Sequence, residues 1–350
     1  MKNPTAAANR MLFLSESNVR QCLTMKDCIE VNRQALISIT KNGGGNVPTR
    51  IGLPYNQSSP LATTGTTTST HPSQDWSLFK PAAFQQPDGS TSHMGMKLVS
   101  VRSENPSRLG LPLVPATIVV MDPPSGMVEA VVSATYLTAA RTAAGSALAT
   151  QLCCRSNSKH VLVFGAGCQA ACHLEAILSV VPTLERITIV NRNVDRANTL
   201  AATLTLPTTV LELQNTVAIQ RALQDADIVV ACTNTMTPLF DGTFLAKGCH
   251  VNGIGSFTPQ MQEIDNVTVQ RSVVLIDTPD ARTVGDLNSI GTNETIMLLG
   301  DVLKTPNLLP SDRDCTFYKA VGTAIQDVMT AHIVVQRAKE LGLGQYVDTS

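Results

Sequence analysis

Residues 160–170 read HVLVFGAGCQA, an apolar run followed at once by a glycine-rich turn. The run predicts a buried strand over 160–164, and the turn has the spacing GxGxxA over Gly165, Gly167 and Ala170. Apolar residues then recur at helical spacing as far as Val181, which predicts a helix that begins at the turn. Gly165 would permit the tight turn, Gly167 the approach of a pyrophosphate, and Ala170 close helix–strand packing. The stretch favours a dinucleotide site over an ordinary glycine-rich turn.

Further strand-like runs follow this unit at regular intervals. They lie at 186–191, 208–213, 227–232, 250–254 and 273–277, separated by helical or Pro/Gly-bounded connections. This alternation is typical of a doubly wound parallel sheet. The predicted fold class is therefore α/β, with a Rossmann domain built around residues 160–170.

The second strand indicates which dinucleotide binds. An NAD-dependent enzyme places Asp or Glu about 20 residues beyond the glycines, where the carboxylate accepts from the ribose hydroxyl. Here the strand ends in Asn191-Arg192-Asn193, and Arg192 can pair with a 2′-phosphate, supported by Arg196 one turn later. We expect NADPH (NADP⁺) to be preferred over NADH. The alternative is a solvated Arg192 engaged by Asp195.

The region before residue 137 has a different pattern. Thr24 begins a helical pattern that stops at residues 41–43, residues 93–101 alternate as a strand, and the runs 116–121 and 127–132 predict a hairpin. The Ser/Thr/Pro/Gln-rich segment 54–92 is expected to be loop-like, a flexible insertion. This first region is predicted to be a mixed α+β unit. A terminal helix is expected to begin at about Thr323, with Gly342 past its end.

Composition excludes several classes of function. The 350 residues carry 26 Lys+Arg against 27 Asp+Glu, and only 4% are aromatic, which disfavours nucleic-acid binding. Nine cysteines, an odd number without a CxxC pair, favour reduced thiols in a cytoplasmic protein over disulfides or zinc. No metal site is predicted. The N-terminus lacks the apolar core of a signal peptide, and residues 131–154 are interpreted as a buried helix rather than a membrane span.

Two cations stand in otherwise uncharged segments. Arg141 lies among small residues in Thr138-Ala-Ala-Arg-Thr-Ala-Ala-Gly145, where its guanidinium can clamp a carboxylate. The alternative for Arg141 is a buried ion pair or a helix-surface position. Lys97 shares a strand face with Val99 and Val101, so it is either a substrate ligand with an altered pKa or a lysine whose ammonium snorkels to water.

The chain resembles the ornithine cyclodeaminase/mu-crystallin family, in order from about residue 10 to 340. The motifs that carry the resemblance are Val47-Pro-Thr-Arg50, Gly95-Met-Lys97-Leu-Val-Ser-Val, Asn105-Pro, Leu111-Pro, Ala116-Thr, Asp122-Pro, Thr138-Ala-Ala-Arg141-Thr-Ala-Ala, Gly165-Ala-Gly-Cys-Gln-Ala170, Asp225-Ala-Asp-Ile-Val, His250-Val-Asn-Gly-Ile-Gly255 and Val321-Gly322 with Asp327. Only the segment 54–92 has little to compare.

The resemblance implies a homodimer whose Rossmann domain is inserted into a substrate and dimerisation domain. We expect the Rossmann domain over 137–317 and the other domain over 1–136 plus 318–350. Family members bind an amino or imino acid carboxylate with residues that align with Arg50, Lys97 and Arg141. The expected cofactor-binding residues are Gly165, Gly167, Gln169, Ala170, Asn191, Arg192, Asn193, Arg196, Thr233, Ile254 and Gly322, of which Thr233 and Ile254 follow strands of the expected sheet.

One departure from the family pattern bears on the reaction. Ornithine cyclodeaminases carry an Asp in the loop that here reads Gly255-Ser256-Phe257-Thr258-Pro259, and Phe257 takes its place. A phenyl ring neither accepts a proton nor holds an ammonium group, which disfavours ornithine cyclodeamination. Loss of the acid resembles the mu-crystallin-like branch, which implies NADPH-dependent reduction of ketimines. Phe257 then becomes a residue of the substrate site.

The leading hypothesis is an NADPH-dependent imine reductase that acts on an α-imino carboxylate. Lys97 and Arg141 are its expected catalytic residues, and Arg50 is expected to help fix the substrate. Three alternatives stay open: an ornithine cyclodeaminase, an amino acid dehydrogenase that works by reductive amination, and a non-catalytic NADPH-dependent binder of a small ligand. The identity of the imine is not specified by the sequence.

Overall fold

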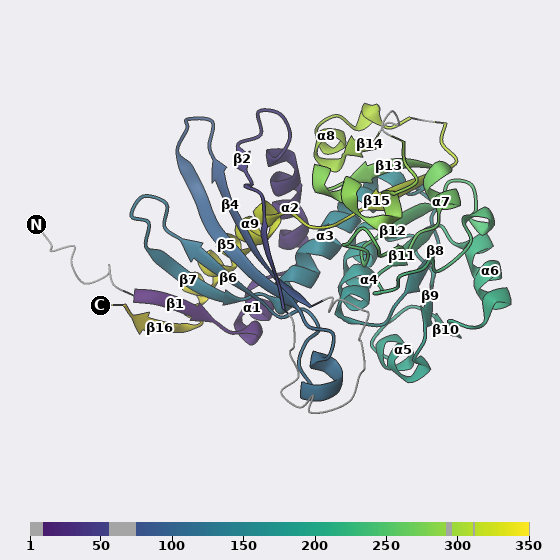
Figure 1. Ribbon diagram of the computed structural model, residues 1–350, viewed down its shortest axis with the longest axis horizontal. Helices are drawn as coiled ribbons and strands as arrows, with labels where there is room; N and C mark the ends of the chain where they lie inside the picture. The colour runs from purple at the N-terminus through teal and green to yellow at the C-terminus, as the bar shows by residue number, and fades with distance from the viewer. Residues whose placement is uncertain (1–9, 56–74, 292–295, 311, 350) are drawn as a thin grey trace, which may run out of the picture. The chain divides into compact units, whose positions relative to one another are not determined.

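The computed structural model describes residues 10–55, 75–291, 296–310 and 312–349. The described chain forms two compact units, drawn in Figure 1. Unit 1 takes its residues from Met1–Leu23, Gly44–Thr138 and Asp327–Ser350, and unit 2 comprises Thr24–Gly43 and the described part of Ala139–Gln326. Unit 2 is thus bracketed in the chain by segments of unit 1. The functional domain bounds expected from the sequence stay a prediction.

Unit 1 is built on a mixed sheet with the strand order β16-β1-β7-β6-β5-β4-β2, with β3 also paired to β4. Most neighbours are antiparallel, and β1 and β7 are parallel. The expected hairpin is confirmed as β6 and β7, with Met121 opposite Val128. The bounds are β1 Arg10–Leu14, α1 Glu16–Cys22, β2 Gly45–Asn46, β3 Ile51–Pro54, β4 Trp76–Gln85, β5 Thr91–Val101, β6 Ala116–Met121, β7 Val128–Ser133 and β16 Gln345–Asp348.

The expectation of a loop over 54–92 is wrong at Pro54, over 76–85 and at 91–92, which are strand, and it is confirmed over 86–90, which form a turn. Residues 56–74 lie outside the described residues. The ten-residue strand β4 pairs along its length with β5. Pro81 falls between the stretch of β4 paired with β3 and the stretch paired with β2, a gap in which a missing N–H is tolerated. Composition suggested a loop because Ser, Pro and Gln in and around β4 are common in loops, whereas the strand is stabilised by its pairing with β5, β3 and β2.

Unit 2 contains an entirely parallel sheet with the order β10-β9-β8-β11-β12-β15-β13-β14. All six predicted strands are present, and β14 and β15 were not foreseen. The order reverses between β8 and β11, the kind of switch point at which open α/β sheets bind ligands. The bounds are β8 His160–Phe164, β9 Arg186–Asn191, β10 Thr208–Glu212, β11 Ile228–Ala231, β12 His250–Gly253, β13 Ser272–Ile276, β14 Ile296–Leu298 and β15 Cys315–Lys319.

In the part of unit 2 that the structure describes, six α-helices accompany this sheet, and the long helices α3 and α9 are shared with unit 1. Thr24 caps α2 by accepting from the Asp27 backbone N–H, as its sequence predicts. The stretch 131–154 is helical only from Thr135, because its first residues complete β7. The bounds are α2 Met25–Ser38, α3 Thr135–Cys153, α4 Cys168–Val180, α5 Val194–Ala201, α6 Thr216–Asp225, α7 Asn266–Gln270, α8 Leu299–Lys304 and α9 Ala324–Leu341.

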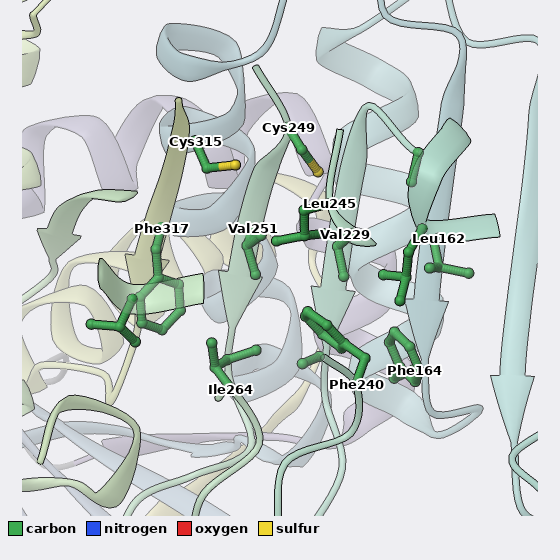
Figure 2. Packing of buried hydrophobic residues seen from close by; sticks show 14 of the residues in the cluster. Leu162, Phe164, Val229, Phe240, Leu245, Cys249, Val251, Ile264, Cys315 and Phe317 are labelled. Atoms are coloured by element: carbon green, nitrogen blue, oxygen red, sulfur yellow. The ribbon is translucent and has the colours of Figure 1, made fainter. Parts of the chain in front are cut away.

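Both faces of the unit 2 sheet are buried. In β8, Val161 and Val163 pack with the apolar face of α4, whereas Leu162 and Phe164 point into a second cluster on the opposite face. Figure 2 shows that second cluster, in which Phe240 stacks on Phe164 at 5.3 Å between ring centroids. Burial on both faces explains why the strand is an unbroken apolar run.

Two further expectations concern the chain as a whole. All nine cysteines are free thiols in the structure. Among the described residues, no helix is both long and apolar enough to cross a bilayer.

Candidate active site

The glycine-rich turn lies between β8 and α4, at the switch point of the parallel sheet. Gly165 has φ 114°, and a Cβ there would come 2.9 Å from the Cys232 carbonyl oxygen, so no other residue fits without strain. Gly167 is the N-cap of the thirteen-residue α4 and offers no side-chain cap. Ala170 is fully buried against the sheet. A turn with two glycines and a small alanine at a helix N-terminus suits the pyrophosphate of a dinucleotide.

The side chains at the tip of β9 are arranged around this turn. Asn193 caps α5 by accepting from the Arg196 N–H at 2.9 Å, and Asn191 donates to the Asn193 carbonyl. Arg196 reaches back to the turn, with its Nε 3.0 Å from the Ala166 carbonyl oxygen. Arg192 is exposed. Arg196 is thus held beside the turn, whereas the side chain of Arg192 extends toward solvent.

The loops after β11 and β12 hold Thr233 and Ile254, both half-buried. They meet at Glu263, a residue that the sequence analysis missed. Its Oε1 accepts from the Thr233 N–H at 2.6 Å and from the Thr233 hydroxyl at 2.7 Å. Its Oε2 accepts from the N–H groups of Gly255 and Ser256. A single carboxylate therefore joins two loops at the carboxyl edge of the sheet.

Behind Glu263 lies a second buried acid with a buried lysine. Asp286 Oδ1 accepts from the Glu263 N–H at 2.6 Å, and Asp286 Oδ2 lies 2.9 Å from Lys319 Nζ. All three side chains are fully buried. Burial raises the pKa of Glu263, an effect that the nearby Lys319 ammonium opposes. Lysine in the apolar strand FYKA was the one sequence signal that could have revealed this group.

Arg141 lies on α3 in unit 2 and is 5% exposed. Its Nη1 is 3.5 Å from Gln326 Oε1, and the guanidinium lies directly on the backbone of Gly322, where a Cβ would come 2.3 Å from Nη1. Asp277 Oδ2 holds that backbone by accepting from the Gly322 N–H at 2.6 Å. Arg141 is therefore a buried and positioned cation, not a helix-surface arginine.

Lys97 lies in unit 1, on the buried face of β5, as its alternation predicted. Its side chain is 1% exposed, and Nζ is 2.7 Å from Oδ1 of the fully buried Asp327. The snorkelling alternative is wrong, because the ammonium does not reach water. Arg50, before β3, and Phe257, in the loop after β12, are each half-buried.

A Rossmann sheet with a glycine turn at its switch point defines a protein of the dinucleotide-binding class. Residues 82–342 match the ornithine cyclodeaminase/mu-crystallin family, and the chain belongs to this family. Over 97% of this chain and 99% of its own length, a Dictyostelium discoideum protein named uncharacterized cyclodeaminase is 30% identical. The Δ¹-pyrroline-2-carboxylate reductase of Colwellia psychrerythraea is 32% identical over 72% of this chain and 82% of its own.

A solved structure shows the same architecture. The Δ¹-pyrroline-2-carboxylate reductase of Thermococcus litoralis, in complex with NADH and L-proline, aligns with a TM-score of 0.83 at 26% identity. The alignment covers 96% of this chain and 100% of that one. The α/β fold, with a Rossmann sheet and a separate mixed sheet, is therefore that of the family.

Proposed function

We propose that the protein is an imine reductase that transfers hydride from NADPH to the C=N carbon of an α-imino carboxylate. It is an oxidoreductase of C=N and CH–NH bonds that uses a nicotinamide cofactor. Support comes from the glycine turn at the switch point and from the relatives named above, two of which are Δ¹-pyrroline-2-carboxylate reductases. A small cyclic imino acid of that kind is the substrate class we favour.

Phe257 is the observation that favours reduction over cyclodeamination. It stands where ornithine cyclodeaminases carry an aspartate, and its ring has no group to take a proton. The neighbouring Ser256 N–H is held by Glu263, so the loop that carries Phe257 is anchored at its start. An apolar side chain at this position suits the methylene groups of an imine ring better than the ammonium group of ornithine.

For the cofactor, the chain's own groups have separable tasks. The α4 N-terminus and the Gly165–Gly167 turn would hold the pyrophosphate, and Arg192 the 2′-phosphate. Arg196 would support the phosphates from its position over the turn. The bound cofactor supplies the hydride. The remaining candidates, including Gln169, Asn191, Asn193, Thr233, Ile254 and Gly322, are proposed to line its binding site.

For the substrate, we propose that Arg50, Lys97 and Arg141 recognise the carboxylate. Arg141 is held by Gln326 and presses on Gly322, so its guanidinium is oriented before substrate binds. Lys97 Nζ donates a hydrogen bond to Asp327 Oδ1 at 2.7 Å, and its other N–H groups can donate to a substrate. A homodimer, and the domain bounds 1–136 plus 318–350 and 137–317, belong to the same proposal.

The test is a screen of NADPH and NADH oxidation over cyclic and linear α-imino acids. We expect oxidation with Δ¹-pyrroline-2-carboxylate or a related imine, faster with NADPH, and faster at mildly acidic pH because a protonated iminium accepts hydride better. Ammonia release from ornithine without net cofactor reduction would instead indicate a cyclodeaminase. Dependence on added ammonia would indicate an amino acid dehydrogenase, and cofactor binding without turnover of any imine would indicate a binding protein.

A further inference from the structure

The carboxylate of Glu263 joins two loops that are otherwise separate in the chain. One loop follows β11 and presents the N–H and hydroxyl of Thr233, and the other follows β12 and presents the N–H groups of Gly255 and Ser256. All four of these groups are hydrogen-bond donors. An ionised carboxylate accepts four such bonds without donating any, which an amide cannot do.

The two loops are in direct contact. A Cβ on Gly255 would come 1.8 Å from the Thr233 carbonyl oxygen and 2.8 Å from the Glu263 carboxylate. Glycine is therefore required for the loops to close on each other around the acid. This contact differs from an ordinary turn, in which a glycine serves only its own backbone conformation.

The place of these loops on the sheet indicates what they face. β8, which leads into the glycine turn, pairs with β11, and β11 pairs with β12, all in parallel. The turn and the two loops therefore follow one another along the same carboxyl edge, about 5 Å apart per strand. A dinucleotide whose pyrophosphate lies on the turn, and whose adenosine half extends toward β9, would place its nicotinamide half along the loops after β11 and β12.

A buried support holds Glu263 in place. Asp286 accepts from the N–H groups of Glu263 and Ile264, and Lys319 balances its charge from the end of β15. Burying two acids and one lysine is unfavourable by itself, since each ion loses its hydration. The unfavourable burial of Glu263, Asp286 and Lys319 is explained if the two loops need a carboxylate held in this position.

We propose that Glu263 is a positioning residue for the nicotinamide half of the cofactor, acting through the loops at Thr233 and Gly255. It does not touch the reacting atoms, because its own oxygens are taken up by the two loops. The inference rests on the cofactor part of the proposed function. It does not depend on which imine is reduced.

The test compares the binding of a whole cofactor and of a fragment that lacks nicotinamide. In Glu263→Gln, the amide NH₂ faces one of the two loops and cannot accept from it, so that loop is released. We expect the Kd of NADPH to rise about tenfold, which is about the net contribution of one hydrogen bond. The Kd of 2′-phospho-ADP-ribose is expected to stay within about twofold of the wild-type value. Equal weakening of both ligands, or of neither, would overturn the proposal.

Asp227 provides a matched control at the opposite edge of the same sheet. Its carboxylate also joins separate segments, accepting from the N–H groups of Lys159 and His160 and pairing with Arg155. Asp227→Asn is expected to change stability without changing the ratio of the two Kd values. If Glu263→Gln does not fold, a second variant, Glu263→Asp, keeps the charge but is one methylene shorter. It is expected to change the ratio of the two Kd values in the same direction by a smaller factor.

The outcome separates this inference from the proposed function. Failure of the wild-type protein to bind NADPH or NADH would contradict the proposed function itself. Binding by the wild-type protein with an unchanged ratio in both Glu263 variants would contradict only the positioning role. If NADH is the preferred cofactor, the same comparison is made with NADH and ADP-ribose.

Discussion

Two buried lysine–aspartate pairs of the described chain, one in each unit, invite comparison. In unit 1, Lys97 Nζ lies 2.7 Å from Asp327 Oδ1, and in unit 2, Lys319 Nζ lies 2.9 Å from Asp286 Oδ2. None of the four side chains is more than 1% exposed. By distance and burial alone the two pairs are equivalent. A buried ion pair is weak evidence for stability, so the surroundings of each must indicate its role.

Those surroundings differ. Asp286 uses its other oxygen on the N–H groups of Glu263 and Ile264, which makes the unit 2 pair part of a loop-supporting network. Lys97 lies on the buried face of β5 together with Gly95 and Val99. Val328, next to Asp327 on α9, has its side chain 3.4 Å from the place where a Cβ on Gly95 would lie. We propose that the Lys319–Asp286 pair organises the backbone of the cofactor site, and that in the Lys97–Asp327 pair Lys97 binds the substrate.

The largest expected effect comes from Lys97→Met. We expect kcat/KM for the imine to fall by about 10² to 10⁴, because a positioned polar group is lost from the proposed substrate site. Stopped-flow NADPH oxidation gives the rate, and fluorescence titration gives the Kd of NADPH, which is expected to remain within about twofold. A kcat/KM within tenfold of wild type would contradict the substrate role of Lys97.

Lys319→Met tests the other pair. Removing one partner leaves Asp286 buried without its counter-charge, and the free energy of unfolding is expected to fall by about 3–5 kcal/mol. Urea denaturation measures this loss. The Kd of NADPH distinguishes the two pairs further. Lys319→Met is expected to raise this Kd, whereas Lys97→Met is expected to leave it unchanged. Identical binding profiles for the two variants would remove the distinction between the pairs.

Lowering the pH is expected to reduce the free energy of unfolding by a smaller amount. The cause is a buried histidine, His173, and not either of the two ion pairs. Burial lowers the pKa of His173 to about 4, consistent with a neutral ring whose Nδ1–H donates to the Gln169 carbonyl while the Ser146 hydroxyl donates to Nε2. The unfolded chain binds this proton near pH 6.5, so stability is complete above that pH and is lost as the pH falls toward 4. Between pH 7.5 and 5 this contributes about 2 kcal/mol.

The measurement is the free energy of unfolding of wild type and His173→Gln at both pH values. The variant is expected to be less stable at pH 7.5 but to lose about 2 kcal/mol less on acidification. Equal losses in the two proteins would show that His173 does not titrate as described, and would assign the acid sensitivity to other groups.

Gly322→Ala gives the smallest effect and tests how Arg141 is held. At φ 77° the new Cβ would come 2.3 Å from Arg141 Nη1, so the guanidinium must move. We expect the KM for the imine to rise about tenfold, equivalent to about 1.4 kcal/mol. Gly342→Ala is the matched control, because Gly342 also has a positive φ, 63°, but its Cβ would meet nothing within 4 Å. A similar KM in both variants would contradict the role given to Gly322.

The strand, turn and helix of the proposed cofactor site were predictable because their signals are local. Three contiguous segments carry these signals: the strand over 160–164, the turn at Gly165 and Gly167, and the helix after it. The spacing of the apolar residues therefore changes from that of a strand to that of a helix at the turn itself. Lys97 could be recognised for the same reason, from its alternation with valines. The strand β4 could not be predicted in this way, because its structure depends on pairing with β5 and β3 rather than on its own composition.

The Glu263 network was missed for a related reason. Glu263, Asp286 and Lys319 are 23 and 33 residues apart in the chain, and only the fold brings them together. Each by itself resembles an ordinary charged residue beside an apolar segment. A lysine at the end of an apolar strand, as at Lys319, was a usable signal, but its partners had no local pattern.

The central claim is tested most directly by following the hydride itself. NADPH deuterated at the transferable C4 position is incubated with the protein and Δ¹-pyrroline-2-carboxylate, and the proline formed is analysed by mass spectrometry and NMR. The account predicts one deuterium on the α-carbon of proline and one NADP⁺ formed per proline. Proline without deuterium, or no consumption of NADPH with any α-imino acid although the cofactor binds, would contradict it.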